Sequence, residues 1–296
     1  MSTWMKRLII CGLGLLAGVI AWPAMDLFIR HQAIFPSFLV FSLASGAVFG
    51  LVFGLVFGTG EGMIAGSNRR IVRGALWGAA LGSAGGTLGF LVGQGVLFAL
   101  GEHMLQTEEA VRLVGLPLAR ATGWAVLGVF VGAAEGVRAW SGRKLAVGIV
   151  GGLVGGFSGG AAIEYGQLLY PRLPVVQLAG LVLFGVLVAL FYSLVERQLS
   201  LGVLRLLNGR YKGKEFVLNQ RRIVVGSADS SDIVLPGYKG VAERHAELRL
   251  RNRELYIGPL DEKTPVHVND DRVTERILKF EDVIRIGAAR LFFRHE

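Results

Sequence analysis

The sequence predicts a six-span α-helical polytopic membrane bundle followed by an all-β sandwich. Apolar residues make up 52% of the 296-residue chain, and charged residues make up 18%, below the roughly 25% of a soluble domain. The charges are uneven, since residues 1–196 contain 20 charged side chains and residues 197–296 contain 33. Glycine follows the opposite trend, with 35 of the 43 glycines in the first part. We therefore expect a membrane domain over 1–196 and a soluble domain over 200–296.

Composition and motifs also exclude several classes of protein. The glycines have no period of three, which excludes collagen, and the single cysteine, Cys11, excludes a disulfide scaffold. The net charge of +9 does not indicate nucleic-acid binding, because the basic residues of the second part alternate with acids. The sequence contains no phosphate loop, no dinucleotide fingerprint and no zinc motif. We therefore expect no catalytic residues, no metal and no cofactor.

Six apolar stretches approach or exceed the roughly 20 residues that span a bilayer. They are residues 8–25, 34–58, 74–100, 113–134, 145–168 and 174–195. The first stretch resembles a signal peptide in position, but Ala21 and Ala24 flank Trp22-Pro23 and leave no small-residue cleavage pattern. We expect an uncleaved first span.

Basic residues cluster before the first span and in alternate connections. The clusters are Lys6 with Arg7, then Arg69, Arg70 and Arg73, then Arg138, Arg143 and Lys144, and finally Arg197. Because cytoplasmic loops carry the excess of Lys and Arg, every cluster falls on one side if all six stretches cross the membrane. This pattern predicts a multi-pass protein of the bacterial inner membrane with both termini in the cytoplasm.

An internal repeat covers much of the membrane domain. Residues 39–86 align without gaps with residues 113–160, at an offset of 74, and 16 of 48 positions are identical. Each copy is expected to be a helical hairpin that turns at the cytoplasmic face. Because both copies then have the same orientation, the duplication is parallel, unlike the inverted repeats common in transporters.

Glycine recurs every four residues within these hairpins. The rows are Gly46, Gly50, Gly54 and Gly58; Gly74, Gly78, Gly82 and Gly86; and Gly148, Gly152, Gly156 and Gly160. A spacing of four places glycines on one face of a helix, where the missing Cβ atoms let two backbones approach closely. We interpret the rows as packing surfaces within one bundle or between copies of the chain. The alternative is a sliding or gating surface.

Few ionisable residues fall inside the spans. Arg120 and Glu164 both lie toward the outer end, where they could form an intramembrane pair; a substrate or ion site is the alternative. Glu61 and Glu135 occupy equivalent cytoplasmic positions and are expected to neutralise loop arginines or to cap the hairpin turn. Gln94 is interpreted as a hydrogen-bonding contact between helices.

After residue 203 the pattern changes to short alternating strands separated by turn signals, which favours a β-sandwich. The expected strands are Val203–Leu207, Glu215–Leu218, Arg222–Val225, Ile233–Leu235, Ala246–Leu250, Glu254–Ile257, Val266–Asn269, Ile277–Lys279, Val283–Ile286 and Leu291–Phe293.

The order of motifs in this part is more specific than its strand pattern. The series is Val224-Val225-Gly226-Ser227, Asp232-Ile233-Val234-Leu235, Arg244-His245-Ala246-Glu247-Leu248, Val268-Asn269-Asp270 and Asp282-Val283-Ile284-Arg285-Ile286-Gly287. It resembles the forkhead-associated (FHA) domain over about 200–294. The resemblance implies an eleven-stranded sandwich whose apical loops bind phosphothreonine peptides. It also implies structural roles for Gly226 and for His245, which braces a loop.

The phosphate-binding positions depart from the family's pattern. Ser227 replaces an arginine that meets the phosphopeptide, while Ala242 and Glu243 replace a serine and an arginine. A phosphate dianion needs cationic or multiple hydrogen-bond donors, so these changes remove most of the family's phosphate contacts. Asn269 matches the asparagine that holds the peptide backbone, although Asp270 replaces its usual glycine neighbour.

Neighbouring loop residues could take over the binding of a partner. Lys239, Arg244, Ser230 and Ser231 are the candidates, together with Ser227 and Asn269. The first hypothesis is a membrane-anchored adaptor or scaffold that organises an unphosphorylated cytoplasmic protein or copies of itself, as FHA-like domains do in some secretion-system rings. The second is a channel- or transporter-like bundle regulated by its cytoplasmic domain, and the third is a phosphothreonine-dependent signalling receptor.

Overall fold

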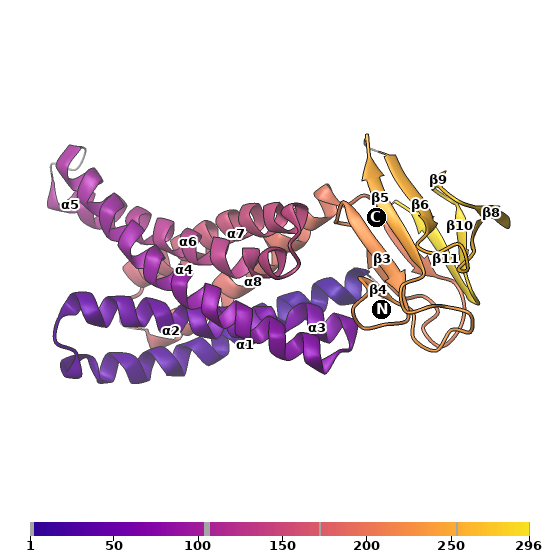
Figure 1. Ribbon diagram of the computed structural model, residues 1–296. Helices are drawn as coiled ribbons and strands as arrows, with labels where there is room; N and C mark the ends of the chain where they lie inside the picture. Colours follow the sequence, from indigo (N-terminus) through magenta and orange to yellow (C-terminus); the bar gives the residue numbers. More distant parts are fainter. Residues whose placement is uncertain (1–2, 104–106, 172, 253, 296) are drawn as a thin grey trace. The chain divides into compact units, whose positions relative to one another are not determined.

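The computed structural model describes residues 3–103, 107–171, 173–252 and 254–295. The chain forms two compact units, shown as ribbons in Figure 1. The helical unit is Arg7–Val195, and the second unit combines Glu196–Glu296 with Met1–Lys6. The Lys6 ammonium, at the beginning of the chain, lies 2.6 Å from a carboxylate oxygen of Glu196, and the Asn219 amide donates to the same carboxylate at 2.9 Å.

In the part of the chain that the structure describes, six helices are long and apolar enough to cross a membrane, which confirms the helical part of the predicted fold class. The long helices are α1 (Thr3–Arg30), α2 (Phe38–Gly58), α4 (Asn68–His103), α6 (Leu116–Arg138), α7 (Gly142–Leu169) and α8 (Pro174–Leu199). Two short helices, α3 (Gly60–Ala65) and α5 (Glu108–Ala110), lie in connections. A π-helical turn, Val111–Gly115, leads into α6.

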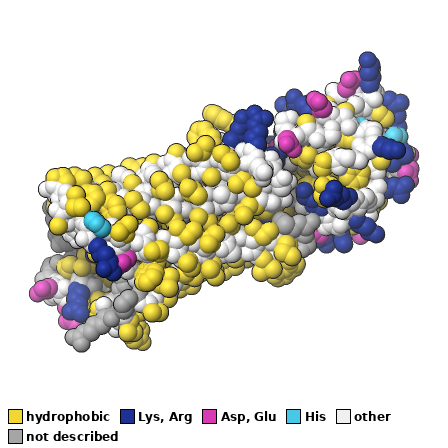
Figure 2. Space-filling view, turned by 90° about the horizontal axis from the view of Figure 1, so that it is seen from below, with side chains coloured by type: hydrophobic (Ala, Val, Ile, Leu, Met, Phe, Trp, Pro, Cys, Tyr) yellow, Lys and Arg dark blue, Asp and Glu magenta, His cyan; other side chains and the backbone are white. Residues whose placement is uncertain are grey.

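The outer surface of the helical unit is apolar. On the face shown in Figure 2, hydrophobic side chains cover much of the helical unit, whereas charged side chains gather over the sandwich and at the helix ends. Among the described residues, the exposed large hydrophobic side chains of the second unit's sandwich are only Tyr211, Ile277 and Phe280; all others belong to residues 4–194. A surface of this kind suits contact with lipid, whereas in water it would favour aggregation.

The two hairpin turns have the same backbone geometry. The amide of Ser67 donates to the Gly62 carbonyl at 3.1 Å, and the amide of Ser141, 74 residues later, donates to the Gly136 carbonyl at 3.0 Å. Each of these bonds spans the end of a helix, and the residue just before the serine has the left-handed conformation that lets the chain turn. That residue is Gly66 in the first hairpin (φ 71°), and its counterpart in the second is Trp140 (φ 48°).

The glycine rows lie where the helices of each hairpin meet. A methyl group on the first glycine of each pair would collide with the backbone of the second. The pairs are Gly46/Gly86, Gly50/Gly82, Gly54/Gly78 and Gly58/Gly74 between α2 and α4, and Gly128/Gly152 and Gly132/Gly148 between α6 and α7. Contacts in the second hairpin therefore repeat those of the first at the same offset. Gly156 and Gly160 instead face Trp124.

The second unit is a two-layered β-sandwich, with the layers visible in Figure 1. One sheet has the order β2-β1-β11-β10-β7-β8, and the other has the order β4-β3-β5-β6-β9. The strands are β1 (Val203–Leu206), β2 (Glu215–Val217), β3 (Arg222–Gly226), β4 (Ile233–Val234), β5 (Ala246–Arg251), β6 (Glu254–Pro259), β7 (Val266–Val268), β8 (Asp271–Val273), β9 (Arg276–Ile277), β10 (Val283–Ile286) and β11 (Ala289–Arg294).

A single apolar core fills the space between the sheets. Alternate residues of the central strands contribute to it, among them Leu204, Val225, Leu248, Ile284 and Leu291, each fully buried. The strand missing from the sequence prediction is β8, which pairs with β7 at the edge of its sheet. Its charged start, Asp271-Arg272, resembles a turn, and edge strands are often short and charged.

Candidate functional site

Five loops meet at one end of the sandwich, and we call them the apical loops. They are residues 207–214, 227–232, 235–245, 260–265 and 287–288. Backbone hydrogen bonds join neighbouring loops: the Ala288 amide donates to the Lys239 carbonyl at 2.9 Å, and the Leu260 amide donates to the His245 carbonyl at 3.0 Å. The sandwich therefore presents a braced set of loops rather than independent segments.

Gly226 and Ser231 help to hold the apical loops in place. A Cβ atom at Gly226 would collide with the backbone of Glu243, so only glycine allows this approach of two segments. The Ser231 hydroxyl is buried and donates to the Glu243 carbonyl at 2.9 Å. The amide of Ser227 donates to the Ala242 carbonyl at 2.9 Å. Ser231 is therefore occupied within the fold and is not placed to meet a partner.

His245 connects two apical loops from a buried position. Its Nδ1 accepts a hydrogen bond from the Ala242 amide at 3.2 Å, and its Nε2 lies 3.2 Å from the Pro265 carbonyl. This arrangement requires the tautomer with the proton on Nε2. The Thr264 hydroxyl adds a bond to the His245 carbonyl at 3.1 Å. The histidine thus fixes loop positions and is inaccessible to a ligand.

Ser230, Lys239 and Arg244 are exposed on the apical loops. Within the described residues, their hydroxyl, ammonium and guanidinium groups have no hydrogen bond or ion pair. Donors of this kind suit an acidic or phosphorylated segment. Glu243 is also exposed, beside Arg244 in the chain, and its carboxylate lowers the positive charge of this surface.

Asn269 is not part of this surface, contrary to the sequence prediction. Val268 pairs with Ile284, whereas Val266 pairs with Ile286 next to the apical turn, so Asn269 lies at the opposite end of the sandwich. Its amide donates to Asp282 at 2.7 Å, and its carbonyl accepts from the Val283 amide at 2.9 Å. Asn269 and Asp270 both have positive φ, 53° and 69°. Asparagine tolerates this backbone, which explains its presence in a two-residue hairpin turn.

A cavity between three apical loops was not predicted from the sequence. It has a volume of about 490 Å³ and lies between residues 208–211, residues 236–239 and Ala288. Arg210 and Lys239 line it, and among the described residues no carboxylate does. The Tyr238 hydroxyl donates to the Asn208 carbonyl at 2.6 Å, and burial raises the pKa of Tyr238, so this donor keeps its proton at neutral pH.

The predicted intramembrane pair lies in the helical unit. An Arg120 nitrogen on α6 is 3.0 Å from a Glu164 oxygen on α7, and the Trp124 indole donates to the other oxygen at 3.3 Å. The Glu164 side chain is 10% exposed and that of Arg120 is 58% exposed. Each carboxylate oxygen therefore has one donor, while most of the guanidinium is uncovered.

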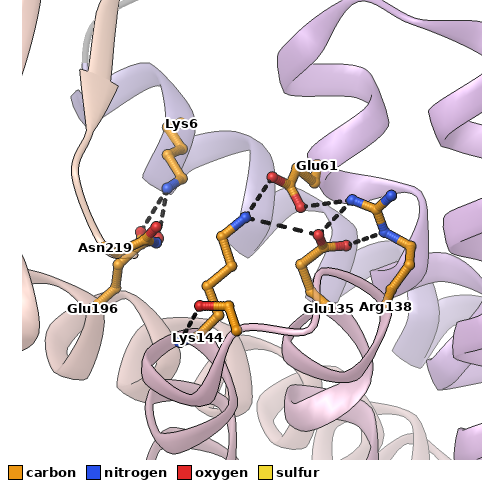
Figure 3. A network of polar contacts seen from close by, with 8 residues as sticks. Lys6, Glu61, Glu135, Arg138, Lys144, Glu196 and Asn219 are labelled. Atoms are coloured by element: carbon orange, nitrogen blue, oxygen red, sulfur yellow. Dashed lines mark hydrogen bonds and ion pairs between the residues drawn. The ribbon is translucent and has the colours of Figure 1, made fainter. Parts of the chain in front are cut away.

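A second charge network joins the two repeats (Figure 3). Glu61 accepts from Lys144 at 2.8 Å and from Arg138 at 3.1 Å. Glu135, its counterpart in the repeat, also pairs with Arg138 and lies 3.8 Å from the Lys144 ammonium. The partners are thus cations at the end of α6 and the start of α7. The sequence predicted that the two glutamates neutralise loop arginines or cap the hairpin turn; both carboxylates pair with Arg138, and both also lie near Lys144, which was not predicted.

Residues 205–296 match the family model described as "Inner membrane component of T3SS, cytoplasmic domain", which has an FHA-like fold. This match confirms the FHA resemblance for the C-terminal region. Among curated proteins, "Glycogen accumulation regulator GarA" of Mycobacterium tuberculosis is 34% identical over 85 residues. These residues are 29% of this chain and 52% of GarA, so the chain spans about half the length of the curated relatives it matches.

Two solved structures resemble about a third of the chain. The "FhaA FHA domain complexed with the intracellular domain of Rv3910" is 28% identical and has a TM-score of 0.29, with 31% of this chain and 98% of that chain covered. The cytoplasmic domain of "the T3SS sorting platform protein PscD from P. aeruginosa" is 23% identical and has a TM-score of 0.29, covering 31% and 78%.

Proposed function

We propose that the chain is a membrane-anchored adaptor whose β-sandwich recruits or organises a cytoplasmic protein through its apical loops. The observation that carries the proposal is the group of unpaired donors, Ser230, Lys239 and Arg244, on braced loops. The family match to an inner-membrane component's cytoplasmic domain supports the same role. The basic clusters of the sequence support a cytoplasmic position for both termini.

The experiment is photo-crosslinking of the full chain in its native membranes. A crosslinking residue at position 230 is combined with Lys239→Ala and Arg244→Ala, which remove two unpaired cations of the apical loops. We expect the crosslinked partner to be lost in this variant and kept in Lys279→Ala, a matched change in the loop that contains Asp282, at the opposite end. Equal crosslinking in all three proteins would show that the apical loops do not recruit the partner.

Phosphothreonine-dependent binding is a second candidate, favoured by the cavity between Arg210 and Lys239. A phosphate there would gain charge-assisted hydrogen bonds, but Glu243 would oppose a dianion nearby. Phosphatase treatment of the membranes before crosslinking separates the two candidates. Loss of the crosslink after treatment supports phosphothreonine recognition, whereas an unchanged crosslink supports an unphosphorylated partner or a second copy of the chain.

A further inference from the structure

A cavity of about 530 Å³ lies among the six long helices of the helical unit. Its volume is within the range that holds a drug-sized molecule. Most of its lining is apolar, with aromatic side chains such as Phe41, Phe49 and Phe90. The cavity lies away from the basic hairpin turns, because its lining residues come from the opposite halves of α2, α4, α6 and α7.

Three amide side chains line this apolar cavity without partners. Gln94 on α4, Gln167 on α7 and Gln177 on α8 all face it. Within the described residues none of the three amides makes a hydrogen bond. Gln94 is therefore not the interhelical contact that the sequence suggested. Gln94 is exposed on the helical unit, and Gln167 and Gln177 are partly exposed. Where this surface contacts lipid, an amide without a hydrogen-bond partner costs free energy, so the three amides favour a polar ligand or water at the cavity.

The polar part of the lining also includes Ser42, Ser45 and the ion pair of Arg120 and Glu164. Trp124 and Arg120 each give the carboxylate one donor, which holds Glu164 in place. A guanidinium has five N–H donors, and in the described structure the hydrogen bond to Glu164 uses one. The available groups are therefore mostly donors, which suit a head group rich in acceptor oxygens.

These residues occupy positions where the repeat changes. At the offset of 74, Gly46 corresponds to Arg120, Gly50 to Trp124 and Phe90 to Glu164. In the first hairpin Gly46 and Gly50 pack directly against the backbone of α4. The second hairpin keeps its glycine contacts nearer the hairpin turn. Farther from the turn, where the cavity begins, the charged cluster of Arg120, Trp124 and Glu164 takes the place of such contacts. The cluster is thus a local departure from a packing pattern that otherwise repeats.

A second cavity adjoins the first under the α1–α2 connection. It has a volume of about 510 Å³ and shares Ile29, Phe38 and Phe41 with the larger one. Arg30 lines it and pairs with Asp26 at 2.7 Å.

From this lining we infer that the cavity binds a single-chain amphiphile with an acidic, oxygen-rich head group, taken from the surrounding membrane. Arg120 and the three glutamines bind the carboxylate or phosphate oxygens, and the apolar chain packs among the phenylalanines. The inference rests on the proposed membrane location and not on partner recruitment by the sandwich. A ligand bound by the helical unit would give that unit a role beyond anchoring the sandwich to the membrane.

The test uses the full chain in phosphatidylcholine nanodiscs and a spin-labelled stearic acid as the probe. The spin label quenches nearby tryptophan, and Trp124 lines the cavity. We expect saturable quenching that disappears in Trp124→Phe and persists in Trp77→Phe, a matched change at an exposed position outside the lining. The uncharged methyl ester of the probe is expected to bind roughly tenfold more weakly, because it loses the charge-assisted bonds to Arg120.

Two variants test the head-group contact. Arg120→Gln is expected to weaken binding of the acid about tenfold and to leave binding of the ester unchanged. Because this variant leaves Glu164 without its cation, the double variant Arg120→Gln/Glu164→Gln provides the same measurement in a neutral site. Inorganic phosphate alone is expected not to compete, since it lacks the chain. Equal binding of acid and ester, or wild-type affinity in both variants, would overturn the inference.

Discussion

Trp140 places a bulky side chain in a conformation that favours glycine. Its φ of 48° corresponds to the 71° of Gly66 in the first hairpin, and both residues end a helix with the same backbone hydrogen bonds. For a residue with a Cβ this conformation costs roughly 1–2 kcal/mol. Trp140 as a whole is 96% exposed, so no burial within the protein offsets that cost.

We therefore expect Trp140→Gly to raise the free energy of unfolding by about 1 kcal/mol, since relief of strain is partly offset by the entropy of glycine in the unfolded chain. Thermal unfolding of the full chain in detergent, followed by circular dichroism, measures the change. Gly66→Ala is the matched reverse substitution and should lower stability by a similar amount. Stabilisation by both substitutions would contradict the strain argument.

The residue scale also shows where a motif misleads. Asn269 was predicted to contact a partner from its place in a motif series, yet its side chain closes a turn with Asp282 and Val283. The sequence does indicate a turn there, because Asn269-Asp270 follows a strand. The end of the sandwich at which that turn lies depends on strand register, which no local pattern contains.

At the scale of elements, the four-residue spacing of glycine predicts helix contacts well. The rows were interpreted as packing surfaces in one bundle or between copies, and the glycines of α2 and α4 lie against each other within one hairpin. The spacing alone could not distinguish these cases, because any two such faces can pack together. The edge strand β8 was not predicted, because its charged residues conceal a weak strand pattern.

Substitutions within a row should be costly at contacts and mild elsewhere. Gly54→Ala places a methyl group against the backbone of Gly78, so we expect a loss of about 1–3 kcal/mol in the free energy of unfolding. Gly12→Ala is the control, because no atom lies within 4 Å of the added methyl group and alanine favours a helix. Unfolding in a denaturing detergent compares the two. Equal stability of both variants would refute close packing at Gly54.

At the scale of the whole molecule, the division into a helical part and a sandwich follows from charge and glycine distribution alone. The positions of the candidate sites do not follow from that distribution. The larger cavity draws its lining from six helices between Met25 and Leu181, and most of the lining residues look ordinary in their own segments. Arg120 and Glu164 were recognisable because charges are rare in apolar spans, whereas Gln167 and Gln177 gave no comparable signal.

The network around Glu61 connects the two repeats, so its loss should weaken the helical unit. Glu61→Gln leaves the Lys144 ammonium, whose side chain is 9% exposed, with Glu135 at 3.8 Å as its remaining carboxylate. We expect a loss of about 1–3 kcal/mol in the free energy of unfolding. Asp26→Asn, which breaks an exposed pair with Arg30, should cost less than about 1 kcal/mol. The same unfolding measurement compares them, and equal costs would exclude a special role for Glu61.

The strand order of the sandwich has a practical consequence for studying it. Strand β1 begins beside the end of β11, where Val203 pairs with Arg294, and both of these positions are remote from the apical loops. The chain therefore enters and leaves the domain at one pole and presents its loops at the other. An affinity tag or fluorescent label fused after residue 296 would leave the loops unobstructed, so binding can be assayed without removing the fusion.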